Sequence, residues 1–402
     1  MFNLDKFINK FVTKRLSSMF RFDIEINRDV LSQKIEEKSV LVIGGAGSIG
    51  SSFIKALLPF KPASLVVVDT NENALAELTR DLRSTKGMYM PFDYLPYPMD
   101  FASSVFEKMF RARGGFDIVG NFSAHKHVRS EKDIYSIEAL LQNNVLHAKL
   151  LLDLLSSFPP EEYFCVSTDK AANPVNIMGA SKRIMEDVIF SYSERFPVKT
   201  ARFANVAFSN GSLPAGFLER IRKLQPLSAP SDVRRYFVSP EESGQICMLA
   251  CMLGNNREIF FPKLKEAQMM TFDAIGTELL HEHGYEVLEC SSDEEAIDKM
   301  EDLKNGSKFY PVHYSISDTS GEKPFEEFVT DTEQTDMERF SSLGVITGKI
   351  IPDQEKVRKL FADLNVAFNQ EETTKEKVVQ IMKEYLPNFE HIETGKSLDE
   401  KM

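Results

Sequence analysis

A strand, a glycine-rich turn and a helix follow one another early in the sequence, and this succession restricts the fold more than any other stretch. Ser39–Ile43 is an apolar run typical of a buried strand, and it leads directly into Gly44-Gly45-Ala46-Gly47-Ser48-Ile49-Gly50. Glycines at this spacing permit a tight turn and a close backbone approach, so the N-terminus of the helix that follows can bind a pyrophosphate. The turn, with Ser48 and Ile49 in it, is therefore a predicted dinucleotide site. No lysine follows Gly50, which argues against a P-loop.

The next predicted strand, 65–68, ends in an acidic residue. Asp69 follows the glycines by about 20 residues, a position from which a carboxylate accepts hydrogen bonds from the adenosine ribose hydroxyls. This favours NAD over NADP, because the carboxylate would repel the additional phosphate of NADP. A purely structural turn followed by an incidental acid is the less favoured alternative.

Strands and helices continue to alternate along the chain. The predicted elements are a strand at Met88–Phe92, a helix at Ser103–Arg113 and a strand at Phe116–Val119. This repetition predicts an α/β fold: a Rossmann-type doubly wound parallel sheet, with a smaller C-terminal substrate domain and flanking helices. Asp100 and Phe101 lie in the loop where such folds often contact the adenine, and a plain solvated turn is an equal alternative there.

A second group of polar residues follows the apolar strand Tyr163–Val166. Thr168, Asp169 and Lys170 come directly after it, at the strand end where parallel α/β sheets usually place their chemistry. Pro174 suits the first turn of a helix, and Met178 and Lys182 are four residues apart, so both are expected on the helix face toward that strand end. A surface ion pair is the less favoured interpretation of Asp169 and Lys170.

Composition excludes several classes of protein. The net charge of −12 disfavours a general nucleic-acid binder, and no apolar run is long enough to span a bilayer. No metal-ligand spacing links the four cysteines, so we expect reduced thiols, no zinc site and a cytoplasmic protein. The cysteines are Cys165, Cys247, Cys251 and Cys290.

Four regions are expected along the 402 residues. The first, 1–36, begins with an amphipathic basic helix, for which packing on protein is favoured over association with a membrane surface. Residues 37–210 form the NAD-binding domain, 211–340 mainly the substrate domain, and 341–402 the C-terminal helices, near 353–368 and 373–385, with a tail.

Several separated motifs resemble those of a known family, the extended short-chain dehydrogenases, and within it the bacterial UDP-N-acetylglucosamine 4,6-dehydratases of polysaccharide biosynthesis. Their order and spacing make the resemblance specific, and they cover most of residues 37–335. Besides the glycine turn they are Lys126-His127-Val128, Ser167-Thr168-Asp169-Lys170 with Asn173-Pro174, Met178-Gly179-Ala180-Ser181-Lys182-Arg183, Arg202-Phe203-Ala204-Asn205-Val206, Arg235-Tyr236-Phe237 and Gly321-Glu322-Lys323.

The resemblance extends the set of expected site residues. Ala124 is expected at the cofactor, and a UDP-sugar substrate is expected to meet residues from several loops. These are Lys126, His127, Asn205, Ser212, Arg235 and Glu322. Tightly bound NAD that is regenerated in each cycle, and a homo-oligomer, are also implied.

Two positions depart from the family pattern. Most short-chain dehydrogenases place a tyrosine four residues before the lysine that here is Lys182, and here that position is Met178. A thioether cannot exchange a proton, which argues against an ordinary alcohol dehydrogenase or a simple epimerase. One branch of the dehydratases shares this substitution. Thr319-Ser320 stands where the family commonly has Arg-Pro, which removes one expected nucleotide contact.

The reaction implied by the resemblance has three steps: oxidation at carbon 4 of the hexose, loss of water across carbons 5 and 6, and hydride return to carbon 6. Lys170 is the expected base at carbon 5 and Asp169 the expected acid, which requires a depressed lysine pKa and a raised aspartate pKa. Thr168 would hydrogen-bond the carbon 4 hydroxyl, and Lys182 would hold the nicotinamide ribose. A UDP-sugar epimerase and a non-catalytic dinucleotide-binding regulator are the alternatives.

Overall fold

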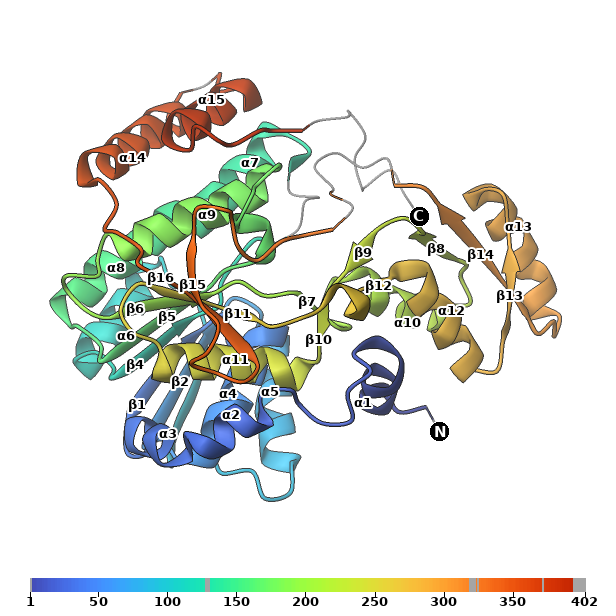
Figure 1. Ribbon diagram of the computed structural model, residues 1–402, viewed down its shortest axis with the longest axis horizontal. Helices are drawn as coiled ribbons and strands as arrows, with labels where there is room; N and C mark the ends of the chain where they lie inside the picture. The colour runs from blue at the N-terminus through green and yellow to red at the C-terminus, as the bar shows by residue number, and fades with distance from the viewer. Residues whose placement is uncertain (1, 127–130, 318–322, 324, 371, 393–402) are drawn as a thin grey trace.

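The computed structural model describes residues 2–126, 131–317, 323, 325–370 and 372–392, and these form two lobes (Figure 1). His127 and Glu322, both expected at the substrate, lie outside the described residues. The larger lobe surrounds a long twisted sheet, and the smaller lobe includes the N-terminal helix. No described helix has both the length and the apolar character needed to cross a membrane.

A nine-stranded sheet forms the centre of the larger lobe, in the order β15-β16-β11-β6-β5-β4-β1-β2-β3. The seven strands from β11 to β3 are parallel, whereas β16 pairs antiparallel with β11 and β15 antiparallel with β16. The sequence prediction of a Rossmann-type parallel sheet is confirmed. The strands are β1 (Ser39–Ile43), β2 (Ser64–Asp69), β3 (Asp93–Pro98), β4 (Ile118–Asn121), β5 (Glu162–Val166), β6 (Val198–Ala201), β11 (Glu258–Pro262), β15 (Gln334–Asp336) and β16 (Leu343–Thr347).

Helices cover both faces of this sheet, and each face has its own apolar core because side chains alternate across every strand. One core is formed with α6 (Ser104–Arg113), α7 (Ile134–Leu141), the π-helix η4 (Gln142–Leu146), α8 (His147–Ser157) and α9 (Ile177–Phe190). The opposite core is formed with α3 (Arg28–Ile35), α4 (Ser48–Leu57), the short η2 (Leu58–Phe60), α5 (Glu72–Ser84) and α11 (Pro240–Leu253). The short α2 (Arg21–Ile26) precedes α3.

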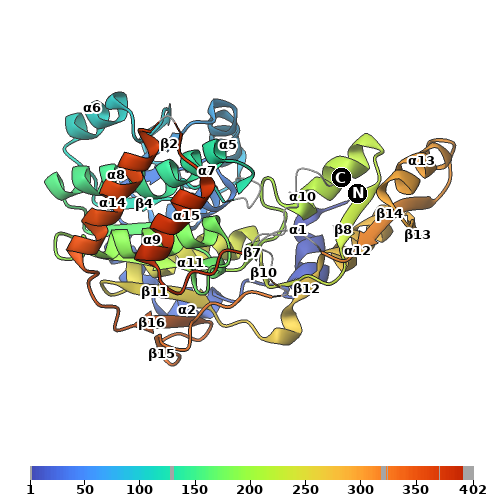
Figure 2. The ribbon, with the colours of Figure 1, turned by 90° about the horizontal axis from the view of Figure 1, so that it is seen from above.

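Two C-terminal helices form a further layer outside α8 and α9 (Figure 2). They are α14 (Gln354–Phe368) and α15 (Lys375–Tyr385), close to the predicted ranges. Phe361 of α14 lies in the same core as α8 and α9, with the Lys149 amine 5.7 Å from its ring centroid. Tyr385 of α15 donates a 3.4 Å hydrogen bond to Asp187 of α9. The C-terminal helices therefore bury the outer side of α8 and α9.

The smaller lobe has a three-stranded parallel sheet, β13 (Glu286–Glu289), β14 (Phe309–Ser315) and β8 (Leu227–Pro230). Around it lie α10 (Leu213–Lys223), α12 (Phe272–Glu282) and α13 (Asp293–Lys304). Two short pairs stand beside them, β7 (Asn205–Val206) with β10 (Phe237–Val238) and β9 (Arg234–Arg235) with β12 (Met270–Thr271). The turn η6 (Glu266–Gln268) precedes β12.

The N-terminal segment packs onto the smaller lobe of its own chain, which agrees with the favoured interpretation of its amphipathic pattern. It forms α1 (Leu4–Phe7) and the π-helix η1 (Ile8–Val12). Phe7, Ile8 and Val12 are buried in the core of the smaller lobe, each at most 3% exposed. Arg15 then links the segment to the larger lobe, through two hydrogen bonds of 2.6 and 2.8 Å to the buried Glu242 of α11.

Two details of the fold differ from the sequence expectation. The strand expected at Met88–Phe92 is wrong: β3 begins at Asp93, which pairs with Ser64, and Phe92 is fully exposed. Because Ser64 is the first residue of β2, residues 88–92 lie before the point where β2 begins. The range 211–340 is divided between the lobes, because α11, β11 and β15 from within it belong to the larger one.

Candidate active site

The glycine turn after β1 is shaped by close contacts that only glycine permits. Gly44 has φ +70°, and a Cβ atom there would lie 2.6 Å from the Ser123 amide nitrogen. A Cβ at Gly50 would lie 2.4 Å from the Gly44 oxygen. Gly47 differs, since a Cβ atom there would lie 3.4 Å from the Gly44 oxygen, its nearest neighbour. Gly47 is the residue before α4, and no side chain forms a capping hydrogen bond at this end of the helix. The turn therefore leaves its open side at the uncapped N-terminus of α4, which fits the pyrophosphate of a dinucleotide.

Asp69 at the end of β2 lies against this turn. One carboxylate oxygen accepts a 3.1 Å hydrogen bond from Ala46 N–H, and the other accepts a 2.9 Å bond from Asn71 N–H. Ser48 and Ile49 form the first turn of α4, and the Ser48 hydroxyl accepts a 2.9 Å bond from Asn210 N–H. The structure thus brings the expected ribose-binding acid and the phosphate turn together.

The other expected cofactor residues follow neighbouring strands of the same sheet edge. Asp100 is exposed in the loop after β3, and Ala124 is half-buried after β4. Phe101 is different: its ring is buried in the core, edge-on to His147 with ring centroids 6.0 Å apart. Because the Phe101 ring is in the core, any contact of this residue with an adenine would have to come from its backbone atoms.

The residues after β5 form a compact hydrogen-bonded group. Thr168 donates a 2.9 Å hydrogen bond to Oδ1 of Asp169, and the same oxygen accepts the Lys170 N–H at 2.9 Å and lies 3.2 Å from Lys170 Nζ. Asp169 is 4% exposed and begins the short helix η5 (Asp169–Ala171). At the carboxyl edge of the sheet Asp169 is therefore buried and Lys170 has only 18% of its side chain exposed, which makes the surface ion pair interpretation wrong.

The protonation of Lys170 differs from the sequence expectation. Burial favours the neutral amine, but the negative charges of Asp169 and Glu326 outweigh it and raise the pKa of Lys170. The expected depression of this pKa is therefore wrong for the protein without bound substrate, where Lys170 is an ammonium.

Helix α9 begins later than expected, at Ile177. Asn176 is its N-cap, and its side chain accepts a 2.7 Å hydrogen bond from Gly179 N–H, so Pro174 lies before the helix. A Cβ at Gly179 would lie 2.6 Å from the Lys170 carbonyl oxygen. The glycine therefore lets the first turn of α9 approach the Asp169–Lys170 group closely.

Met178 and Lys182 are both buried on α9. Met178 is 3% exposed and belongs to the apolar core, while Lys182 is 4% exposed and donates a 3.1 Å hydrogen bond from Nζ to the Val166 carbonyl. Burial lowers the pKa of Lys182, against the opposing effects of Cys165 and Glu186. Lys182 therefore presents its amine to the end of β5, immediately before the Thr168 group.

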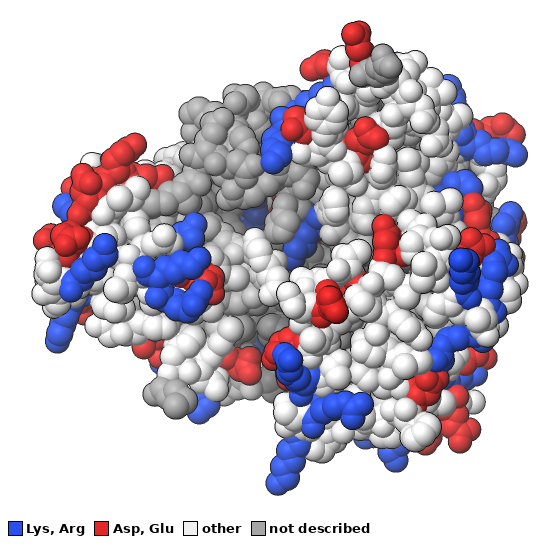
Figure 3. All heavy atoms as spheres, turned by 180° about the vertical axis from the view of Figure 1, so that it is seen from behind, with Lys and Arg blue, Asp and Glu red and all other residues white. Residues whose placement is uncertain are grey.

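The expected substrate residues come from both lobes. Lys126 is exposed beyond β4, Asn205 N–H donates to Tyr236 O at 3.1 Å, and Ser212 caps α10 by accepting from Ala215 N–H at 3.3 Å. Arg235 on β9 is 4% exposed and donates a 2.9 Å hydrogen bond to the Lys323 carbonyl. Seen from behind, the surface is hollowed between the lobes, with lysine or arginine atoms inside the hollow (Figure 3).

Glu326 was not expected at the site. It is 4% exposed, and its Oε1 lies 3.6 Å from Lys170 Nζ. The only sequence signal is that it follows the Gly321-Glu322-Lys323 motif by a few residues.

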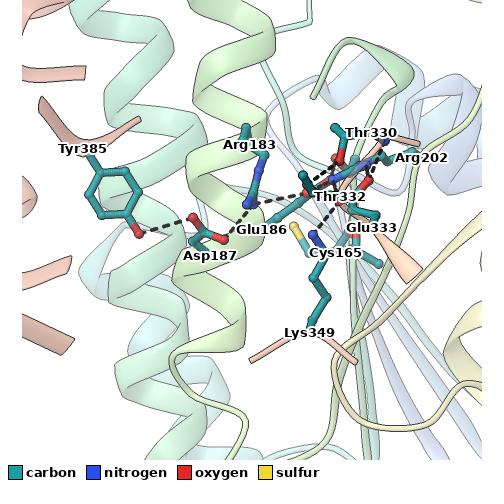
Figure 4. Close-up of polar contacts among 12 residues, drawn as sticks. Cys165, Arg183, Glu186, Asp187, Arg202, Thr330, Thr332, Glu333, Lys349 and Tyr385 are labelled. Atoms are coloured by element: carbon teal, nitrogen blue, oxygen red, sulfur yellow. Dashed lines mark hydrogen bonds and ion pairs between the residues drawn. The ribbon is translucent and has the colours of Figure 1, made fainter. Parts of the chain in front are cut away.

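A buried ion network underlies the site and was also not expected (Figure 4). Arg202, directly after β6, is fully buried and pairs with Glu186 of α9 at 2.7 Å and with Glu333 at 2.8 Å. Ser167 donates a 2.7 Å hydrogen bond to Glu186, and Lys349 pairs with Glu333. The network therefore joins the strand that ends at the candidate catalytic residues to α9 and to the 328–333 segment.

Charge compensation explains why these acids remain ionised while buried. Burial alone would raise the pKa of Glu186, yet Arg202 lowers it. Burial would likewise raise the pKa of Glu333, but hydrogen bonds and charge from Arg202 and Lys349 outweigh it and lower this pKa to about 2.

The structure therefore places a glycine turn of the dinucleotide-binding type and an acid–lysine group at one edge of a parallel sheet, as Rossmann-type folds do. The polysaccharide biosynthesis protein family matches residues 40–347, and the chain belongs to that family.

Three curated relatives are similar to the chain. An uncharacterized membrane protein of Methanocaldococcus jannaschii, MJ1061, is 28% identical over 88% of this chain and 98% of its own. The inverting UDP-N-acetylglucosamine 4,6-dehydratase of Campylobacter jejuni is 25% identical over 72% and 81% of the two chains. The UDP-glucose 4-epimerase of Rickettsia massiliae is 26% identical over 72% and 87%. The chain spans only 50% and 40% of two larger curated relatives.

Among solved structures, the chain is similar to Pen from Bacillus thuringiensis. The TM-score is 0.62, with 19% identity over 83% of this chain and 99% of Pen. At this identity the likeness supports the fold and no particular reaction.

Proposed function

We propose that this protein is a UDP-N-acetylglucosamine 4,6-dehydratase, which forms a UDP-4-keto-6-deoxy-N-acetylhexosamine. The observation that carries the proposal is the hydrogen-bonded group of Thr168, the buried Asp169 and Lys170. It lies beside α9, on which Met178 stands where most short-chain dehydrogenases have tyrosine. An acid and an amine held side by side are what elimination of water requires, whereas epimerisation needs no such pair.

The proposed cofactor is NAD. The open side of the glycine turn at Gly47, the N-terminus of α4 and Asp69 are the groups that would hold it. When bound, NAD would supply the hydride acceptor for oxidation at carbon 4 and the hydride donor for reduction at carbon 6. Lys182, whose buried amine donates to the Val166 carbonyl at the end of β5, would hold the nicotinamide ribose and favour the developing oxyanion.

Thr168 is proposed to take part in the first proton movement. Its own proton is directed to Oδ1 of Asp169, and its oxygen accepts one long hydrogen bond of 3.5 Å from Lys170 N–H, so a second lone pair is available to accept from the carbon 4 hydroxyl, directly or through a water. The carbon 4 proton would pass through the Thr168 hydroxyl to the Asp169 carboxylate, and the Asp169 acid formed in this way would protonate the leaving hydroxyl at carbon 6. Lys170 would remove the carbon 5 hydrogen once it is an amine. The water formed at carbon 6 takes up the proton released at carbon 4.

Incubation of the purified protein with UDP-N-acetylglucosamine tests this proposal. The expected product has lost one water, and no net NADH accumulates. Asp169→Asn and Lys170→Ala should each lower turnover by about 100-fold or more while nucleotide binding remains. The matched control is Lys299→Ala, which removes the exposed Lys299–Glu295 pair of α13 and should leave turnover unchanged.

The product distinguishes the alternatives. A product of unchanged mass with altered configuration at carbon 4 would replace the proposal with the epimerase. Bound NAD with no conversion of the UDP-sugar would favour a binding protein, and full activity in both site variants would refute the roles of Asp169 and Lys170.

A further inference from the structure

Lys170 lies between two buried carboxylates that come from distant parts of the chain. Its Nζ atom is 3.2 Å from Oδ1 of Asp169 and 3.6 Å from Oε1 of Glu326, and both carboxylates are 4% exposed. Asp169 also accepts from Thr168 and from a backbone N–H, so its hydrogen-bonding capacity is partly used. Glu326 is the second carboxylate within 4 Å of the same ammonium.

The position of Glu326 is fixed by contacts on both sides of it. Asn173 donates a 2.9 Å hydrogen bond to Glu327, while Arg202 donates a 3.0 Å bond to the Phe328 carbonyl. The Phe328 ring stacks on Phe261 of β11, with ring centroids 6.1 Å apart. Asn173, Arg202 and Phe261 all belong to the larger lobe. Their contacts with residues 327 and 328 therefore fix the neighbouring Glu326 beside Lys170.

Four charged groups act on Glu326: Lys170 and Asp169 from η5, Arg235 from β9, and Lys323. Burial raises the pKa of Glu326 and Asp169 raises it further, whereas the three cations oppose this and do not cancel it. Glu326 is consequently a good proton acceptor for a carboxylate. Lys170 has to lose a proton before it can act, because a base at carbon 5 must be a neutral amine and the raised pKa keeps Lys170 as an ammonium.

We propose that Glu326 takes the proton from the Lys170 ammonium and so produces the amine that acts as the base at carbon 5. This inference rests on the proposed dehydratase function and adds a residue to it. One N–H bond of the ammonium breaks and one O–H bond forms on Glu326, so an ion pair becomes a neutral pair and no outside reagent is needed. Glu326 acts through Lys170, so it is a positioning residue.

The protons balance over a cycle. The amine removes the carbon 5 hydrogen and becomes an ammonium again while Glu326 remains a carboxylic acid. When the hydride has returned to carbon 6, Lys170 gives a proton back to carbon 5, and the Glu326 proton then returns to the amine. The resting ion pair is restored without a change in the net charge of Lys170 and Glu326.

The first test needs no substrate. The rate of acetylation of Lys170 by acetic anhydride is measured against pH by peptide mass spectrometry, in the wild-type protein, in Glu326→Gln and in Glu327→Gln. Removing Glu326 should move the midpoint of Lys170 reactivity to lower pH, because one of the two carboxylates that favour the ammonium is gone. Glu327→Gln is the control, since Glu327 is exposed and bonds to Asn173, and its midpoint should match the wild type. An unchanged midpoint in Glu326→Gln would overturn the inference.

The second test follows turnover against pH. Proton transfer inside the pair predicts a wild-type kcat that is flat near neutral pH. Glu326→Gln should lower kcat by about 100-fold at pH 7 with little change in KM. Its rate should rise about tenfold per pH unit, because the ammonium then has to lose its proton to water. Glu326→Asp should recover part of the loss.

These results separate the two proposals. A loss of kcat in Glu326→Gln that is the same at every pH would indicate a structural role and overturn the inference. A wild-type protein that does not dehydrate UDP-N-acetylglucosamine, yet shows the shifted Lys170 midpoint, would refute the proposed reaction and leave the coupling of Glu326 to Lys170 established.

Discussion

The guanidinium of Arg202 holds the carboxylate of Glu333 with two parallel hydrogen bonds of 2.8 and 2.9 Å, although the residues are 131 positions apart. Both side chains are buried, Arg202 completely and Glu333 with 5% exposed. Bidentate pairing of this kind satisfies the charge of each partner and fixes their relative orientation. The 328–333 segment, and with it Glu326, is positioned on the larger lobe through this contact.

Replacement of Glu333 by glutamine should lower the free energy of unfolding by an amount that depends on pH, because it removes the Arg202–Glu333 pair. The pKa of Glu333 is about 2, below the value of about 4.3 usual for glutamate in an unfolded chain, so its stabilising effect is fully present above about pH 4.3 and is lost as the pH falls through about 2. Wild type should therefore exceed Glu333→Gln by about 3 kcal/mol at pH 6, with a narrowing difference below pH 4. Urea unfolding at several pH values measures it, and Glu301→Gln on the exposed face of α13 is the control.

The glycines of the turn should respond differently to alanine. Gly50→Ala places a methyl group 2.4 Å from the Gly44 oxygen and should destabilise the protein by about 3 kcal/mol. Gly47→Ala meets nothing closer than 3.4 Å at φ −71°, so its stability should remain within about 1 kcal/mol of wild type. Its affinity for NAD should fall at least about tenfold, measured by calorimetry, because the methyl group projects from the open side of the turn. Unchanged NAD affinity in Gly47→Ala would place the dinucleotide elsewhere.

Met178 should be replaceable by leucine. The side chain is 3% exposed in an apolar core, and a thioether takes no part in proton transfer, so Met178→Leu should keep kcat within about threefold and stability within about 1.5 kcal/mol. Steady-state turnover and thermal unfolding measure the two quantities. A hundredfold loss of turnover without a loss of stability would give the sulfur a chemical role.

Phe7 should contribute strongly to the smaller lobe. It is 3% exposed and lies 5.8 Å from Phe208, measured between ring centroids, so Phe7→Ala should cost about 3 kcal/mol in urea unfolding. Phe22 is 58% exposed, and Phe22→Ala should change stability by no more than about 0.5 kcal/mol. Equal effects of the two substitutions would mean that the N-terminal segment does not pack on this lobe in solution.

Local patterns explain what could be predicted from the sequence. The glycine turn, the strand before Thr168 and the C-terminal helices each depend on residues close together in the chain, and all were found near their expected positions. The start of α9 was misplaced because both Pro174 and Asn176 suit a helix N-terminus, and the side-chain cap at Asn176 prevailed.

Contacts between distant residues explain what could not be predicted. Glu326 meets Lys170, and Arg202 meets Glu333, only after the sheet has formed and the 325–333 segment has crossed to it. No spacing rule connects such residues. The ammonium form of Lys170 was missed for the same reason, since one of the two carboxylates that favour it comes from this segment.

The order of the strands in the large sheet has a consequence for synthesis on the ribosome. Strands β5 and β6 emerge early, yet β16, which pairs with β11 on the far side of β6, follows them by more than a hundred residues. Until Glu333 has been translated, the guanidinium of Arg202 lacks one of its two carboxylates. The nascent larger lobe therefore cannot complete its interior until β16 and the C-terminal helices, whose Phe361 lies in the same core, have been translated.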